Sequence, residues 1–135
     1  MTDKEKVKGK LQEGIKAFVE KNFNEAIDRF SEAIDMAPDF TLAYISRGSA
    51  YNRMDKLDEA MNDFNKALAL KPDYTRAYHQ RGLLHEKKGE NEKALEDFDK
   101  AIDLDPEYGA AYYSRASLHS KQIGRASCRE RVCHR

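Results

Sequence analysis

Several features that would point to particular classes of protein are scarce or missing in this chain of 135 residues. Its 24 Lys and Arg residues balance 24 Asp and Glu residues, so no net charge attracts nucleic acid or an anionic membrane. No apolar run approaches the about 18 residues that a membrane helix needs. The first residues lack the apolar stretch of a signal peptide. We therefore expect a cytoplasmic protein that binds neither nucleic acid nor membranes.

Cysteine is also scarce, and both copies lie in a tail that breaks the pattern of the rest. Residues 122–135 read QIGRASCRERVCHR, and part of this run resembles the read-through of a common sequencing adapter in one reading frame. We expect this tail to be non-native or disordered, and the natural protein to continue past Lys121 with other sequence. Cys128, Cys133 and His134 offer three ligands at an unusual spacing, whereas a zinc site takes four, so we expect no metal site.

The chain has only three prolines, and they are evenly spaced. Pro38, Pro72 and Pro106 recur with a 34-residue period. The same step recurs at Gly14, Gly48 and Gly82, at Ala26, Ala60 and Ala94, at Phe30, Phe64 and Phe98, and at Ala33, Ala67 and Ala101. A fixed period of about 20–50 residues is the signature of a stacked repeat protein.

Each period predicts two short helices. Apolar and small residues recur at steps of three and four on both sides of a polar break, as in amphipathic helices joined by a tight turn. The first helix of each pair, helix A, is predicted at about 4–20, 41–54 and 75–88. The second, helix B, is predicted at about 24–37, 58–71 and 92–105, and a proline closes it. A further helix from Gly109 to about Lys121 repeats helix A, and Thr2 with Glu5 fits a capping box.

These motifs resemble the tetratricopeptide repeat over residues 7–121. The second period carries an aromatic-x3-Gly-x2-aromatic helix A from Tyr44 and an Ala-x3-aromatic-x2-Ala helix B from Ala60, followed by the closing proline. The first repeat departs from the pattern at Lys10 and Ala17, where the family prefers aromatic residues.

The resemblance implies an all-α fold, a right-handed superhelical solenoid of three helix-turn-helix repeats with a C-terminal capping helix. Residues 1–121 are expected to form one domain, with repeats at about 7–40, 41–74 and 75–108 and a partial repeat at 109–121. A single hairpin buries its apolar face only against the next copy, so stability is expected to depend on neighbouring repeats.

The resemblance also implies a binding surface, because in the family helix A lines a concave groove that holds an extended peptide or a helix. On the repeat frame the predicted groove residues are Leu11, Ile15, Phe18, Leu42, Ile45, Ser49, Asn52, Arg76, His79, Gln80, Leu83 and Tyr113. Chaperone-adaptor members grip a C-terminal carboxylate with Lys, Asn and Arg, at places that here hold Leu11, Ile15, Ser46, Arg76 and Gln80. Only Arg76 keeps a matching charge, so we expect a ligand held by something other than its terminal carboxylate.

Charges at equivalent repeat positions reverse sign together. Helix A carries Glu13, Arg47 and Arg81, and helix B of the same repeat carries Arg29, Asp63 and Asp97 at a constant interval further along the chain. This pattern predicts ion pairs Glu13–Arg29, Arg47–Asp63 and Arg81–Asp97. Partly exposed pairs of this kind are worth about 1 kcal/mol at most, so their role would be register more than stability.

No catalytic set or phosphate-binding glycine loop is apparent, so we expect neither an enzyme nor a cofactor. The leading interpretation is a scaffold that binds a protein or peptide in the concave groove. The alternative is an oligomerisation or spacer segment of a larger multidomain protein, which self-associates through its C-terminal end. RNA binding would need a basic stripe with stacking aromatics, which the sequence lacks.

Overall fold

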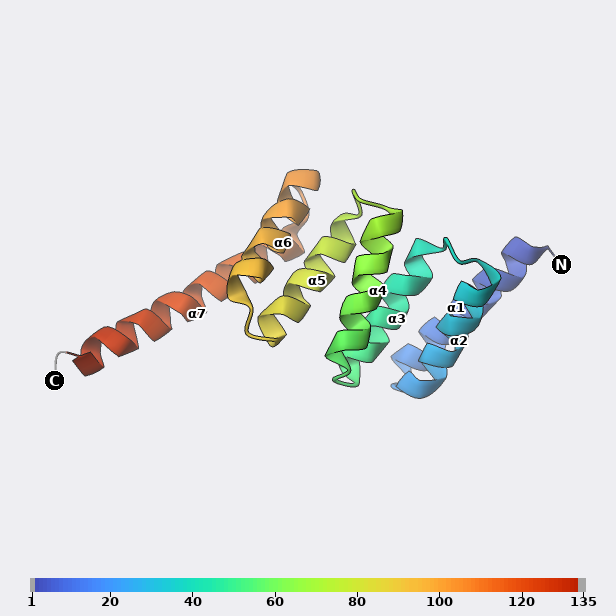
Figure 1. Cartoon of the computed structure of the whole chain (residues 1–135), viewed down its shortest axis with the longest axis horizontal. Helices are drawn as coiled ribbons and strands as arrows, with labels where there is room; N and C mark the ends of the chain where they lie inside the picture. Colours follow the sequence, from blue (N-terminus) through green and yellow to red (C-terminus); the bar gives the residue numbers. More distant parts are fainter. Residues whose placement is uncertain (1, 134–135) are drawn as a thin grey trace.

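In the described part of the chain, six helices lie side by side in an elongated row and a seventh, longer helix extends away from the end of the row (Figure 1). The computed structural model describes the backbone of residues 2–133 and the side chains of residues 2–124. The helices are α1 (Asp3–Val19), α2 (Phe23–Met36), α3 (Thr41–Arg53), α4 (Leu57–Leu70), α5 (Thr75–Lys87), α6 (Asn91–Leu104) and α7 (Gly109–Cys133). Helices α1 to α6 form three helix-turn-helix pairs, and α7 packs on α5 and α6. The predicted all-α fold of paired helices is confirmed.

The six paired helices begin and end within one residue of their predicted bounds. The capping box is also present, since the Glu5 amide donates to Thr2 Oγ1 at 3.2 Å and the Thr2 amide donates to Glu5 Oε2 at 3.4 Å. Helix α7 differs, because it ends at Cys133 rather than near Lys121. Its backbone thus continues as helix into the tail that we expected to be non-native or disordered. The side chains weighed as metal ligands, Cys128, Cys133 and His134, lie outside the described ones.

A close contact between a glycine and a phenylalanine holds each helix pair together. Phe30, Phe64 and Phe98 are almost wholly buried, each against the glycine of its own repeat. A Cβ atom added at Gly48 would lie 2.7 Å from Phe64 Cε1, and one at Gly82 would lie 2.6 Å from Phe98 Cε1. Any larger residue would force the two helices apart, which explains the shared 34-residue step of Gly and Phe.

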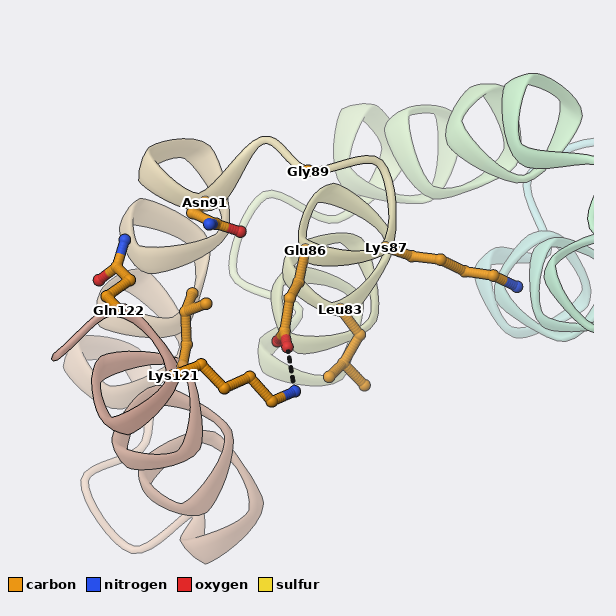
Figure 2. A pocket seen from close by; sticks show the side chains of 8 residues that line it. Leu83, Glu86, Lys87, Gly89, Asn91, Lys121 and Gln122 are labelled. Carbon is orange, nitrogen blue, oxygen red and sulfur yellow. Dashed lines mark hydrogen bonds and ion pairs between the residues drawn. The ribbon is translucent and has the colours of Figure 1, made fainter. Parts of the chain in front are cut away.

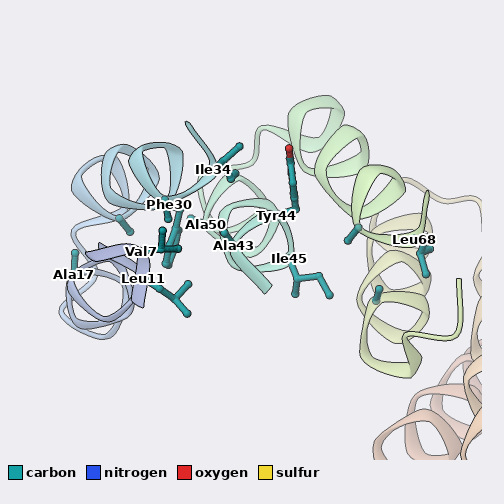
Figure 3. Close-up of a cluster of buried hydrophobic side chains, with 14 residues drawn as sticks. Val7, Leu11, Ala17, Phe30, Ile34, Ala43, Tyr44, Ile45, Ala50 and Leu68 are labelled. Atoms are coloured by element: carbon teal, nitrogen blue, oxygen red, sulfur yellow. The ribbon is translucent and has the colours of Figure 1, made fainter. Parts of the chain in front are cut away.

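Contacts between repeats complete the core (Figure 3). Ile45 and Tyr44 of α3 are buried in a cluster that also contains Leu68 of α4 and Ala77 of α5. The Tyr44 hydroxyl donates to the Pro38 carbonyl at 2.9 Å, and the Tyr78 hydroxyl donates to the Pro72 carbonyl at 3.0 Å. The aromatic residue of helix A therefore ties down the proline loop before it, which accounts for the recurrence of both.

The turn inside each pair uses one residue in the left-handed region. These residues are Lys21 (φ 66°), Asp55 (φ 64°) and Gly89 (φ 80°), which are equivalent in the repeats. After each of them the next amide closes the helix, as when Lys56 donates to the Tyr51 carbonyl at 2.9 Å. Only the third repeat places glycine here, although a left-handed conformation costs other residues about 1 kcal/mol.

Ion pairs join helix A to helix B in all three repeats. Arg47 makes a two-pronged contact with Asp63, at 2.9 Å from Nε and 2.8 Å from Nη2, and Arg81 makes the same contact with Asp97 at 2.8 Å from both nitrogens. These hydrogen bonds raise the pKa of both arginines. In the first repeat Glu13 lies 3.8 Å from Arg29, whose shorter bond of 2.7 Å goes to Glu32.

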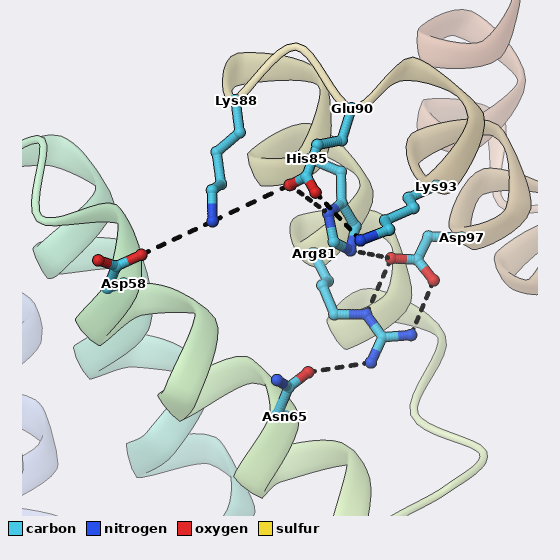
Figure 4. A network of polar contacts seen from close by, with 8 residues as sticks. All are labelled: Asp58, Asn65, Arg81, His85, Lys88, Glu90, Lys93 and Asp97. Carbon is cyan, nitrogen blue, oxygen red and sulfur yellow. Dashed lines mark hydrogen bonds and ion pairs between the residues drawn. The ribbon is translucent and has the colours of Figure 1, made fainter.

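Arg47 and Arg81, and Arg115 at the equivalent place in α7, also reach back to the preceding repeat. Arg47 Nη1 donates to Ser31 at 3.2 Å, Arg81 Nη1 donates to Asn65 at 3.0 Å, and Arg115 Nη1 donates to Asp99 at 2.7 Å. Figure 4 shows Arg81 between Asp97 and Asn65, with His85 beside the same carboxylate at 3.6 Å. Arg47 and Arg81 therefore each link two consecutive B helices. Because the carboxylates of Asp63 and Asp97 are buried, we expect these pairs to contribute to stability as well as to the register that the sequence suggested.

One repeat position was wrongly assigned to the groove. Leu11, Ile45 and His79 occupy equivalent places in helix A, and all three are buried, Ile45 with 0% of its surface exposed. This position faces the next repeat rather than solvent. Tyr113 holds the same place in α7 and is 77% exposed, because no further repeat covers it among the described residues.

His79 is the polar member of this set. Its Nε2 lies 2.9 Å from Ser114 Oγ on α7, and its ring packs edge-on against Tyr108 at 5.4 Å between centroids. Its Nδ1 is buried without a hydrogen-bond partner in the described part of the chain. Burial lowers the pKa of His79 below its ordinary value.

Replacing Arg47 by Met should lower the free energy of unfolding by about 2–3 kcal/mol, because it leaves the buried Asp63 carboxylate without its partner. The double variant Arg47→Met/Asp63→Leu should regain much of this loss. Urea unfolding of both variants measures the difference. If the single variant loses no more than an ordinary surface substitution does, about 0.5 kcal/mol, the proposed role of the pair is contradicted.

Acidification should destabilise the protein through His79. Because its pKa is lowered in the folded state, the unfolded chain takes up the proton first as the pH falls through about 6.5. Unfolding free energy should thus fall from pH 7.5 to 5.5, with a His79 contribution of at most about 1.4 kcal/mol per pH unit. His79→Leu should show a smaller fall, because the buried ring that takes up a proton more readily on unfolding is then absent. Equal falls would show that His79 is not the titrating group.

Candidate binding groove

The A helices lie next to one another along one side of the row. Helices α1, α3, α5 and α7 each contact the next along the row. A hollow of about 460 Å³ lies among the first three of them, and we call it the main hollow. Its lining residues are Ile15, Phe18, Phe30, Leu42, Ser46, Ser49, Asn52, Arg53, Arg76 and Gln80.

The main hollow has an apolar part at the N-terminal end of the row. Ile15 is 43% exposed there, although it is a large aliphatic residue. Phe18 and Leu42 are half-buried beside it, and Phe30 reaches the hollow from helix B of the first repeat. Ile15 therefore leaves apolar surface in contact with solvent that a ligand can cover.

Polar and cationic groups surround this apolar part. Ser46, Ser49, Asn52 and Gln80 supply neutral hydrogen-bonding groups from α3 and α5. The guanidinium carbon of Arg53 lies 5.7 Å from the Phe18 ring centroid and 5.1 Å from that of Phe23. Those two rings pack edge-to-face at 5.3 Å, so Arg53 rests on a fixed aromatic support.

A cationic residue stands at the position of Arg53 in the following repeats as well, but it makes a different kind of contact there. Lys87 stands one repeat after Arg53 and donates to the Asn52 carbonyl at 3.1 Å, and it also pairs with Asp55 at 3.0 Å. Lys121 stands one repeat further and pairs with Glu86 at 3.0 Å. One cationic position per repeat thus joins the C-terminal ends of neighbouring A helices.

A second hollow of about 420 Å³ lies between α5, α6 and α7 (Figure 2). Leu83 and Leu118 supply its apolar lining, and the Lys121–Glu86 ion pair lies along its edge. Its remaining lining residues are Lys87, Gly89, Asn91 and Gln122.

The predicted groove residues are found in four different places. The main hollow brings together Ile15, Phe18, Leu42, Ser49, Asn52, Arg76 and Gln80, and the second hollow contains Leu83. Leu11, Ile45 and His79 are in the core, and Tyr113 lines neither hollow. Sequence reasoning missed Phe30 in the main hollow and several residues of the second hollow, namely Gly89, Asn91, Leu118, Lys121 and Gln122. The signal for Lys121 was present, because it holds the place of Lys87 in the next 34-residue period.

Some other kinds of site find no support in the described residues. His79 and Ser114 are hydrogen-bonded, yet both are buried, so a substrate has no access to this pair. No cluster of His, Cys, Asp and Glu in the described part of the chain could hold a metal ion. None of the described helices combines the length and apolarity needed to cross a bilayer.

Comparisons with known proteins agree with this architecture. Residues 48–89 match a family model described as TPR repeat, and residues 75–108 match one described as tetratricopeptide repeat. No curated protein sequence matches the chain.

Three solved structures illustrate the similarity. The first TPR of Spaghetti (RPAP3) bound to the HSP90 peptide SRMEEVD is 28% identical, with 88% of this chain and 94% of that chain covered and a TM-score of 0.82. The first TPR domain of human RPAP3 is 27% identical, with 90% and 95% covered and a TM-score of 0.83. MamA is 28% identical, with 86% and 68% covered and a TM-score of 0.78. Residues 48–108 of this chain therefore carry tetratricopeptide repeats, and the structural similarity to tetratricopeptide repeat domains extends over most of the chain.

Proposed function

We propose that this chain is a non-catalytic scaffold that binds a segment of a partner protein, a peptide or a helix, in the main hollow. The observation that carries the proposal is the exposed Ile15 next to Phe18 and Leu42. Burying such side chains against a ligand supplies the main favourable term of association. The Ser, Asn and Gln side chains beside them can pair with the ligand backbone.

A similar structure supports a peptide as the ligand. The Spaghetti domain, which is 28% identical, is seen with a peptide of HSP90. The mode of holding the ligand should differ in this chain. Of the five places used to grip a terminal carboxylate, Leu11 is buried, Ile15, Ser46 and Gln80 are uncharged, and only Arg76 is cationic. A segment within a partner chain therefore fits better than a free terminus.

Self-association is the second candidate, and α7 favours it. Tyr113 is largely exposed at a position that is core in the other repeats, and Tyr112 beside it is 39% exposed. A second copy could cover this face. Sedimentation of the full chain over a range of concentrations tests this directly, since a monomer at all concentrations would exclude it.

Selection from a phage-displayed library of random peptides, using the full chain as bait, tests the groove. Peptides that bind the wild type should lose at least about tenfold in affinity for Ile15→Asp/Leu42→Asp, because each substitution puts a charge where apolar groups must be covered. Leu70→Asp is the matched control, an exposed leucine at the end of α4 outside both hollows.

Circular dichroism must show unchanged helicity for the variants to count. Ile45→Asp is unsuitable as a test, since Ile45 is fully buried and its substitution would unfold the repeat. Equal affinity of the selected peptides for the wild type and for Ile15→Asp/Leu42→Asp would refute binding in the main hollow.

A further inference from the structure

Two arginines at the main hollow differ from the other arginines with described side chains. Arg29, Arg47, Arg81 and Arg115 each pair with a carboxylate. Arg53 and Arg76 make no ion pair with any described residue, and both are exposed. A guanidinium beside an apolar surface and without an anion is ready to accept one from a ligand.

The main hollow itself supplies no negative charge. Its ten lining residues include two arginines and no Asp or Glu. By contrast, a hollow on the other side of the first repeat contains Glu13, Glu20 and Glu25 together with Lys10, Lys16 and Arg29. In a chain with equal numbers of acidic and basic residues, the groove is therefore locally cationic.

The two arginines stand at opposite ends of the A helices. Arg53 is the last residue of α3, whereas Arg76 is the second residue of α5, one repeat after Leu42. Measured along helix A, Arg53 therefore lies eleven residues beyond the place equivalent to Arg76. At the rise of an α-helix this is a distance of about 16 Å. The apolar part of the hollow extends between the two arginines, because Leu42 is near the start of its helix A and Phe18 is near the end of its own.

We propose that the partner segment is an acidic one, with apolar residues at its centre and Asp or Glu on both sides of them. The inference rests on the proposed function and names the chemistry of its ligand. The apolar centre covers Ile15, Phe18 and Leu42, and the flanking carboxylates meet Arg53 and Arg76. A guanidinium binds a carboxylate through two parallel hydrogen bonds, and Arg53 is already held by the Phe18 and Phe23 rings.

The phage selection of random peptides, run on three proteins, tests whether the groove prefers acidic peptides. Wild-type chain should enrich peptides with Asp or Glu on both sides of an apolar centre. Arg53→Gln/Arg76→Gln should enrich apolar peptides without that acidic preference. Lys66→Gln/Lys100→Gln is the control for total charge, since both lysines are exposed on B helices, and it should select as the wild type does.

Affinities of one selected acidic peptide give the magnitude. Loss of each arginine should weaken binding up to about fivefold, as for exposed ion pairs, and loss of both should weaken it on the order of tenfold. The salt dependence of binding should be steep for the wild type and shallow for Arg53→Gln/Arg76→Gln, because added salt screens the two ion pairs. A random single-stranded oligonucleotide is a competitor that should not displace the peptide.

The outcomes separate the two proposals. Peptides that need Ile15 and Leu42 but show no acidic preference would overturn the acidic ligand and leave groove binding intact. Peptides whose affinity changes neither with Ile15→Asp/Leu42→Asp nor with Arg53→Gln/Arg76→Gln would overturn groove binding itself. Displacement by the oligonucleotide with an affinity that matches the peptide would show that the arginines serve a nucleic acid, and would overturn the acidic segment.

Discussion

The close approach of glycine and phenylalanine within each repeat is the constraint on which the structure depends. The ring of Phe64 fills the space that a side chain at Gly48 would need, so the two helices cross at one distance and angle. Because the same contact recurs with Phe98 and Gly82, successive pairs present matching surfaces and can stack in a row. The partly buried Arg47–Asp63 and Arg81–Asp97 pairs then fix the register of the two helices. The groove exists because this packing leaves one side of every helix A without a core neighbour.

Helix A has three faces, and each makes different contacts. One face meets helix B through Gly48 and Arg47. Another meets the next repeat, where Ile45 is replaced by His79 at the cost of a buried, unpaired ring nitrogen among the described residues. The groove face carries Ile15 in the first repeat, Ser49 in the second and Leu83 in the third, at one equivalent position.

Much of this could be predicted from the sequence, because the 34-residue period repeats every constraint three times. The helices, the capping box and the pairing of Arg47 with Asp63 all follow from comparing equivalent residues or from local motifs. The division between core and groove did not follow. Ile45 and Ser49 are four residues apart, so they lie about 40° apart around the helix, and periodicity places them on one face. Only the position of the next repeat buries Ile45 and leaves Ser49 in the hollow, and that position is a property of the packed assembly.

The contacts made by Arg53, Lys87 and Lys121 at one repeat position imply that successive junctions between repeats respond differently to ionic strength. Arg53 lies over the aromatic rings of Phe18 and Phe23, an attraction in which no anion takes part. Lys121 holds α7 to Glu86 through an ion pair whose lysine is 60% exposed, and salt screens such a pair readily. Concentrated salt would therefore weaken this link between α5 and α7 more than the link that Arg53 makes to the first repeat.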